Sequence, residues 1–330
     1  MNHVTPLALA TGLLLLSAAS CKKDDSTSPA TTSDEVVVAV SKANFLAGGL
    51  SEAVSVVSRT LSDGTTADCY KIVVKSIPTD HAMGPWCPTN IADDASKGGI
   101  WLENGNVYDV DGAFIKNMAT FYKDNTWMLY NASTGAVTKT QTQADCAAAA
   151  NPNVGAEYKN FCVECLPSYV ANLTHTYYLP ITPKKAATPL VFATGPGMGP
   201  PGSTAGPSSR GIAFNGVVFD APAPVSNILA AYTLAPFDDA GGHINLAAGY
   251  HYHAATGLST KIAQTDGHAA MIGYAFDGYG MYERLSVAGT EYPDLDASRG
   301  HSDATRGYHY HVDKAGNNNF INGLRGVYAN

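Results

Sequence analysis

The sequence predicts a mostly β fold, with α+β as the alternative, built around an internally duplicated pseudo-twofold core. Only 15% of the 330 residues are charged, whereas Gly (32), Tyr (18) and Pro (18) are abundant, a composition typical of turn-rich β proteins. Two twelve-residue stretches, GHINLAAGYHYH and GHSDATRGYHYH, share seven letters at the same positions. This repetition predicts that the chain builds one structural unit twice.

A second pattern precedes each of these stretches. The segments IAFNGVVF (Ile212–Phe219) and YAFDGYGM (Tyr274–Met281) both read as a strand that enters an Asn-Gly or Asp-Gly turn. These dipeptides are the strongest short-range signal for a β-hairpin. Residues 211–257 and 273–316 are therefore predicted to be the two copies of the unit.

The rest of the chain also favours strands. From Cys69 onward the runs YKIVVKSI, GIWLENGNVYDV, HTYYLPI and PLVFAT are each bounded by Gly, Pro, Asn or Asp. Residues 90–170 are richer in Ala and polar residues and are predicted to be an insertion with some helix. Residues 36–62 are ambiguous, because EVVVAV favours a strand whereas LSEAVSVVSRTL has helical spacing with Ser51 as a candidate N-cap.

The N-terminus has the layout of an export signal. Residues 6–19 are apolar or small and too few to span a bilayer. The letters SAASC resemble a bacterial lipoprotein signal, so residues 1–20 are predicted to be a signal peptide and Cys21 the lipidated residue, although the n-region has no Lys or Arg. The alternative is an ordinary signal peptide with an incidental cysteine.

The residues after Cys21 support a location outside the cytoplasm. The letters KKDD resemble an export signal of bacterial surface lipoproteins, and residues 21–35 read as a lipid-bearing cysteine with a flexible polar tether. We therefore expect the protein to be lipid-anchored at the outer membrane or cell surface, with the membrane as its partner.

Two classes of ligand are disfavoured by the sequence. A net charge of −8 without a cluster of Lys or Arg argues against nucleic-acid binding, which needs a basic face. Gly197, Gly199 and Gly202 form a literal GxGxxG, but neighbouring prolines lack the backbone donors that a dinucleotide phosphate needs.

Five cysteines remain beyond Cys21. An oxidising location favours disulfides, and an odd number leaves one thiol unpaired. We expect Cys69–Cys87 to be the first pair. Cys162 and Cys165 have CxxC spacing, for which we favour structural disulfides over a zinc or redox site because no second CxxC accompanies them.

The repeated histidines are the main functional signal. Side chains of a strand alternate between its faces, so His251 and His253 are predicted to share one face and Tyr250 and Tyr252 the other. The segment NLAAG could turn the chain so that His243 joins the first pair. Three neutral imidazoles suit zinc or copper among the divalent transition metals. The predicted metal ligands are His243, His251, His253, His301, His309 and His311.

The sequence leaves open whether the six histidines form two sites or one shared site, and a purely structural role is the alternative. Two further histidines, His81 and His268, are candidates for additional ligands or for structural hydrogen bonding. Nearby aspartates could orient the imidazole N–H groups from outside the ligand set. The candidates for this role are Asp238, Asp277 and Asp296.

Three classes of function remain open at this point. The first is metal binding. The second is a metal-dependent hydrolase acting on an extracellular substrate, because an open three-histidine metal site activates water. The third is an adhesion or glycan-binding module with structural histidines. The sequence has neither HExxH nor GxSxG, so it assigns no catalytic residue.

The motifs GIAFNGV, DDAGGH, YHYH, MIGYAFDGYGMY, LDASRGH, GYHYHV and INGLRG together resemble the YHYH family over residues 211–326. The stretch IPTDHAMGPW (Ile77–Trp86) resembles the N-terminal part of that family. The resemblance implies one domain over residues 69–330, with the candidate insertion at 90–170, after an ambiguous segment at 36–68. Family members are mostly secreted or membrane-anchored bacterial proteins without an established biochemical role, so the resemblance implies no reaction.

Overall fold

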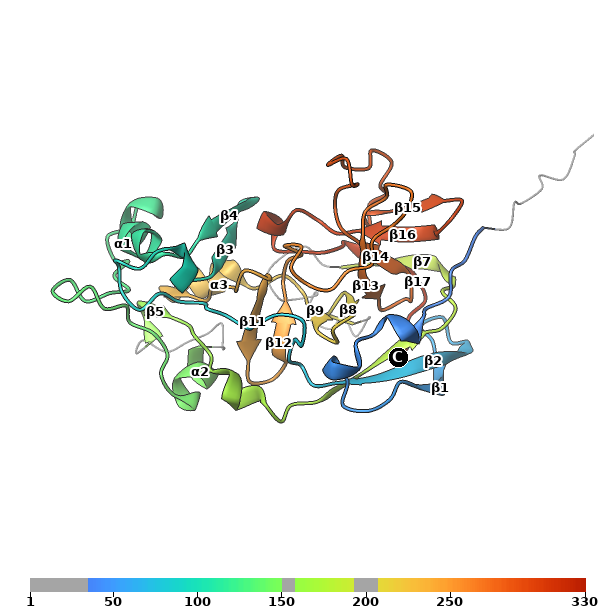
Figure 1. Ribbon diagram of the computed structural model, residues 1–330, viewed down its shortest axis with the longest axis horizontal. Coiled ribbons are helices and arrows are strands. Elements are labelled where there is room, and N and C mark those ends of the chain that lie inside the picture. The colour runs from blue at the N-terminus through green and yellow to red at the C-terminus, as the bar shows by residue number, and fades with distance from the viewer. Residues whose placement is uncertain (1–34, 150–157, 193–206) are drawn as a thin grey trace, which may run out of the picture. The chain divides into compact units, whose positions relative to one another are not determined.

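Strands dominate the computed structural model of the protein, which describes residues 35–149, 158–192 and 207–330 (Figure 1). The mostly β class predicted from composition and turns is confirmed, and three α-helices occur in the described part of the chain. None of the helices in these ranges is long and apolar enough to cross a membrane. The predicted signal peptide, most of the tether and the GxGxxG glycines lie outside the described residues.

The largest sheet has eight strands in the order β11-β12-β9-β8-β13-β14-β16-β15 (Figure 1). All eight come from the region in which the sequence predicts the repeated unit. In chain order they are β8 (Gly211–Ala213), β9 (Val218–Phe219), β11 (Gly242–Asn245), β12 (Gly249–Tyr252), β13 (Met271–Ala275), β14 (Gly280–Tyr282), β15 (Gly300–Asp303) and β16 (Gly307–His311).

The two halves of this sheet, followed outward from the central β8–β13 pair, have the same arrangement of parallel and antiparallel strands. Each half has a hairpin (β8–β9 or β13–β14), then a parallel strand (β12 or β16), then an antiparallel edge strand (β11 or β15). The edge pairs even share a register, with His243 opposite His251 and His301 opposite His309. Strand order and register therefore recur where the sequence repeats, whereas an origin by duplication stays a prediction.

The two hairpins turn at the predicted dipeptides. Gly216 and Gly278 have φ values of +85° and +87°, a backbone conformation that residues with a side chain rarely adopt. Asn215 Oδ1 accepts a hydrogen bond from the Val217 amide, and Asp277 Oδ1 accepts one from the Tyr279 amide. Local turn chemistry thus suffices to place both hairpins.

A three-stranded sheet precedes the repeated unit in the chain. Its order is β1 (Ser55–Thr60), β2 (Thr66–Val74) and β6 (His175–Pro180). The helix suggested for LSEAVSVVSRTL is therefore wrong, because β1 pairs antiparallel with β2 and the β-branched residues of this segment suit the pleated edge. The EVVVAV segment forms only an isolated bridge between Val37 and Gly307.

Three two-stranded sheets and the helices complete the described fold. The strand pairs are β3 (Ile100–Glu103) with β4 (Asn106–Asp109), β5 (Phe161–Cys162) with β10 (Thr233–Leu234), and β7 (Lys185–Val191) with β17 (Gly323–Gly326). The helices are α1 (Gly112–Phe121), α2 (Gln143–Ala149) and α3 (Val225–Ala230). The Asp111 carboxylate caps α1 by accepting from the Phe114 amide at 2.7 Å.

The disulfides differ from the expected pairing. Cys87 is bonded to Cys162 and Cys146 to Cys165, whereas Cys69 is a free, buried thiol in β2. The expected Cys69–Cys87 pair is wrong because β2 pairs with β1 and β6, while Cys87 lies near the 161–163 segment. The structural role predicted for the CxxC cysteines is confirmed, although each of them has its own distant partner.

Residues 90–170 contribute α1 and α2, so the predicted helical content is present there. Their buried side chains, including Trp101 and Leu129, belong to the same hydrophobic core as Phe214 and Phe237. The Cys87–Cys162 disulfide ties this region to the segment before it, and the Cys146–Cys165 disulfide lies within it. The region is therefore packed into the main core.

Candidate metal centres

The first group of histidines comes from the β11–β12 pair. The chain alternates as predicted at residues 250–253, because the His251 and His253 imidazoles lie together while the hydroxyls of Tyr250 and Tyr252 bond to other groups. The Nε2 atom of His243 lies 3.1 Å from that of His251 and 3.2 Å from that of His253. The short β11–β12 connection therefore returns His243 to the pair, as the sequence predicts.

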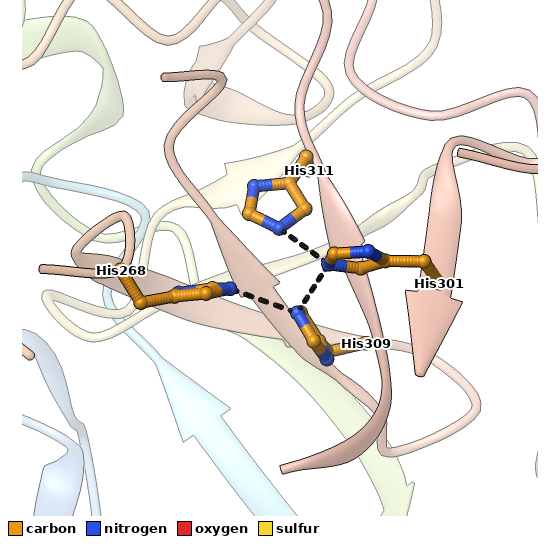
Figure 2. A group of neighbouring side chains, drawn as sticks. All are labelled: His268, His301, His309 and His311. Atoms are coloured by element: carbon orange, nitrogen blue, oxygen red, sulfur yellow. Dashed lines mark hydrogen bonds between the residues drawn. The ribbon is translucent and has the colours of Figure 1, made fainter. Parts of the chain in front are cut away.

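The second group is the equivalent arrangement on β15 and β16, with one addition (Figure 2). The Nε2 atom of His301 lies 3.0 Å from that of His309 and 3.2 Å from that of His311. His268, from the segment before β13, brings its own Nε2 atom within 3.0 Å of that of His309. The ligand atoms of each group lie within 4.8 Å of one another, and the two groups are separate.

Hydrogen bonds on the far side of the rings determine which nitrogen carries the proton. Nδ1 of His251 lies 3.0 Å from the Gly249 carbonyl, and Nδ1 of His253 lies 2.6 Å from the Ala221 carbonyl. A carbonyl oxygen can only accept, so Nδ1 must donate, and in a neutral imidazole Nε2 is then an unprotonated acceptor.

The second group follows the same rule. Each Nδ1 atom faces an acceptor at 2.8–3.0 Å. The acceptors are the carbonyls of Ala269, Gly307 and Glu283 for His268, His309 and His311, and the Asp294 carboxylate for His301. All four Nε2 atoms are therefore left with their lone pairs directed at one another (Figure 2).

Converging lone pairs repel one another unless a cation lies between them. Burial lowers the pKa of His243, His251 and His253 in the first group, which disfavours a proton as that cation. In the second group burial lowers the pKa of His309 to about 4 and that of His311 to about 2. Near neutral pH, a metal ion is a cation that both groups could hold.

The spacing of the nitrogens also fits a metal ion. Zinc–imidazole bonds of about 2.0–2.1 Å would place two ligand nitrogens about 2.9 Å apart at a right angle and about 3.4 Å apart in a tetrahedron. Five neighbouring Nε2 pairs, at 3.0–3.2 Å, lie between these values, and all ligand atoms of a group lie within 4.8 Å of one another. Both groups could therefore hold a metal ion.

The candidate aspartates occupy a different position from the one expected. Tyr250 donates to Asp238, Tyr308 to Asp296 and Tyr310 to Asp277, each at 2.6–3.0 Å. These carboxylates hold the tyrosines that alternate with the histidines and also accept backbone N–H groups, so they brace the strands. The carboxylate that does orient an imidazole is Asp294, which no sequence motif indicates.

His81 does not belong to either group. Its Nδ1 atom lies 2.8 Å from Asp80, and its ring lies against those of Tyr250 and Tyr252, which are on the opposite face of β12 from His251. Of the two histidines considered as additions, only His268 joins a ligand group.

The two groups differ in whether a fourth imidazole is present. In the second group His268 provides it. The rings of Tyr282 and Tyr292 contact this group, and Tyr292 is stacked on His311 with 3.8 Å between the ring centroids. In the sequence, the residue corresponding to His268 in the first copy is Gly206, which has no ligand atom. A site with four protein ligands is closed, whereas one with three keeps a position for water or another molecule.

The first group borders a cavity of about 180 Å³. Its lining is mostly apolar, with Ala, Pro, Ile and Val side chains, but it includes the carboxylate of Asp220. Asp220 Oδ1 accepts hydrogen bonds from the Ser209 hydroxyl (2.7 Å) and the Ala221 amide (2.8 Å). Both of these bonds end on Oδ1. The sequence contains no motif around Asp220, so only the fold reveals it.

One of three comparisons with known proteins found a match. The family model described as YHYH protein matches residues 176–294, about a third of the chain. The match includes the first histidine group and His268 and ends before His301. Searches among curated proteins and among solved structures found no match. Over residues 176–294, therefore, the chain is similar to the YHYH protein family.

Proposed function

We propose that the protein is a lipid-anchored surface protein that binds divalent transition metal ions at its two histidine groups. The observation that carries the proposal is the convergence of unprotonated Nε2 atoms, three in one group and four in the other. Donor sets made of imidazole alone suit zinc or copper better than magnesium or calcium, which prefer oxygen. The lipid anchor rests on the SAASC pattern at Cys21.

The test is a metal count on the protein without residues 1–21. After purification with zinc or copper and removal of loosely bound ions, we expect about two equivalents per chain. His251→Ala and His309→Ala should each remove one equivalent, and the double variant should remove both. His175→Ala is the matched control, because His175 lies in β6 outside both groups.

The metal count can also reject the proposal. Wild-type protein that holds less than about a tenth of an equivalent of any transition metal would not be a metal-binding protein. Loss of both equivalents in each single variant, with a native circular dichroism spectrum, would show that the two groups do not bind independently.

A second candidate function is metal-dependent hydrolysis at the first group. It is favoured by the cavity that His243, His251 and His253 share with Asp220. A metal with an open position lowers the pKa of bound water towards 7, and Asp220 is the lining carboxylate that could accept the proton. Asp220→Asn should then abolish hydrolysis of activated ester or phosphate substrates while both metal equivalents remain. Hydrolysis that survives in His251→Ala would exclude this function.

A further inference from the structure

A second cavity lies away from the histidine groups. Its volume is about 710 Å³, within the range of small-molecule sites. It is lined by the β3–β4 turn around Asn104, by α3, by Arg210 before β8 and by the asparagine-rich segment 316–322. Neither the metal proposal nor the family match gives this cavity a role.

Arg210 is the unusual residue in the lining. Its side chain is only 4% exposed, and its guanidinium is stacked on the Phe192 ring at 3.8 Å from the centroid. Its Nη1 donates to the Ser208 carbonyl, while its buried Nε has no hydrogen-bond partner among the described residues. A buried guanidinium normally has a carboxylate or another anion beside it, because leaving the charge unpaired is costly.

No described carboxylate fills that place. Arg210 has no ion pair within 4.0 Å in the described part of the chain, and Asp220 uses Oδ1 for Ser209 and Ala221. The fourteen residues 193–206 that precede it in sequence contain no Asp or Glu. The guanidinium therefore has no direct ion-pair partner among these residues, although the Asp220 carboxylate acts on it electrostatically from a longer distance.

The acidic residues that line the cavity are already engaged. Glu103 Oε2 accepts from Trp101 Nε1 and from the Tyr122 hydroxyl. Asp313 pairs with Arg299 at 3.3 Å. Arg210 is thus the charged group of the described lining that has no ion pair within 4.0 Å.

The rest of the wall suits a hydroxylated molecule. Side-chain amides of Asn104, Asn317, Asn319 and Asn322 line the cavity, and the Asn319 Oδ1 atom is buried without a partner. The Asn319 Nδ2 donates to Asn322 Oδ1 at 2.9 Å, so the two amides are already oriented. Pro222, Val225 and Leu229, which are partly exposed, add apolar surface on which a sugar ring could lie.

We propose that this cavity binds a sugar acid, with its carboxylate paired to Arg210 and its hydroxyls bonded to the asparagine amides. The proposal uses none of the histidines, so it stands or fails independently of metal binding.

The experiment uses the metal-replete protein without residues 1–21. The probe is a mixture of D-glucuronate, D-galacturonate and D-gluconate, and the matched neutral mixture is glucose, galactose and glucitol at equal ionic strength. Isothermal titration should detect binding of the acids and at least tenfold weaker binding of the neutral sugars. Arg210→Gln should weaken binding of the acids by about 10- to 100-fold, the usual range for a lost charged hydrogen bond, whereas Arg284→Gln, at an exposed pair with Glu291, should not.

A second readout covers the case in which Arg210→Gln does not fold. Phenylglyoxal modifies arginines, and mass spectrometry of the wild-type protein would show whether the acid mixture protects Arg210 while the neutral mixture does not. Acids that bind no better than neutral sugars, or equal modification of Arg210 in both mixtures, would overturn the proposal.

Discussion

The Nε2 atoms of His268 and His309 lie 3.0 Å apart although 41 positions separate the two residues in sequence. His268 precedes β13 and His309 lies in β16, which is separated from β13 by β14 in the sheet. This contact turns a group of three imidazoles into a group of four. It therefore distinguishes the second histidine group from the first, whose strands are otherwise equivalent.

The fourth imidazole leads to the first prediction. His268→Ala should leave one metal ion in the second group but weaken its binding at least tenfold, since loss even of an outer-shell partner costs 10- to 100-fold. Competition with a chelator measures this change. His81→Ala is the matched control, because His81 lies outside both groups and should leave both affinities unchanged. Equal affinities in His268→Ala and wild type would show that His268 is not a ligand.

The second prediction concerns Asp277 and pH. Burial raises the pKa of Asp277 to about 6. Between about pH 4 and 6 the folded state therefore keeps a proton that the unfolded chain has lost, so this group's contribution to stability falls as pH rises. From pH 4 to 7 the decrease should be of the order of 3 kcal/mol.

Asp277→Asn removes this pH-dependent contribution, and the other half of the sheet shows that an amide fits, because Asn215 occupies the equivalent turn. The unfolding free energy of the wild type minus that of Asp277→Asn should therefore decrease as pH rises from 4 to 7. Urea denaturation at four pH values checks this. A constant difference for Asp277→Asn would refute the prediction.

The third prediction concerns the disulfides. The Cys87–Cys162 bond closes 75 residues and the Cys146–Cys165 bond closes 19. In the chain-entropy model their removal costs about 4.5 and about 3 kcal/mol, because the longer loop restricts the unfolded chain more. Paired Cys→Ser variants compared by denaturant midpoint test the order of the two costs, and a larger loss from the shorter loop would contradict it.

The same pairing predicts the thiol count. The protein without residues 1–21 should have one free thiol, that of Cys69, which reacts with iodoacetamide only after unfolding because the side chain is 0% exposed. Mass spectrometry without prior reduction identifies the labelled cysteine. Labelling at Cys146 or Cys165 under these conditions would show that their disulfide does not form.

The fourth prediction concerns the anchor. If Cys21 carries lipid, the full chain expressed in a bacterium that processes lipoproteins should incorporate labelled palmitate and sediment with membranes. Cys21→Ser should remove the label and release the protein from the membrane fraction, because the acyl chains provide the attachment. Unlabelled wild-type protein would indicate an ordinary signal peptide.

Local patterns predicted much of the fold and of the first histidine group. The Asn-Gly and Asp-Gly turns at Gly216 and Gly278 occur as expected, because a positive φ is a property of a few adjacent residues. The alternation of His251 and Tyr252 across β12 follows from the two-residue period of a strand. The helix expected after Ser51 failed for the opposite reason: pairing with β2 decided its structure against a helical spacing.

By itself, the sequence determined the strand-rich class, the two tight hairpins and the two histidine triplets, because each depends on residues that are close in the chain. Only the tertiary structure decided that Cys87 bonds to Cys162, that His268 completes a group of four, and that Asp220 and Arg210 line cavities. These relationships join segments far apart in sequence. They depend on which strands lie side by side, and no local pattern specifies that order.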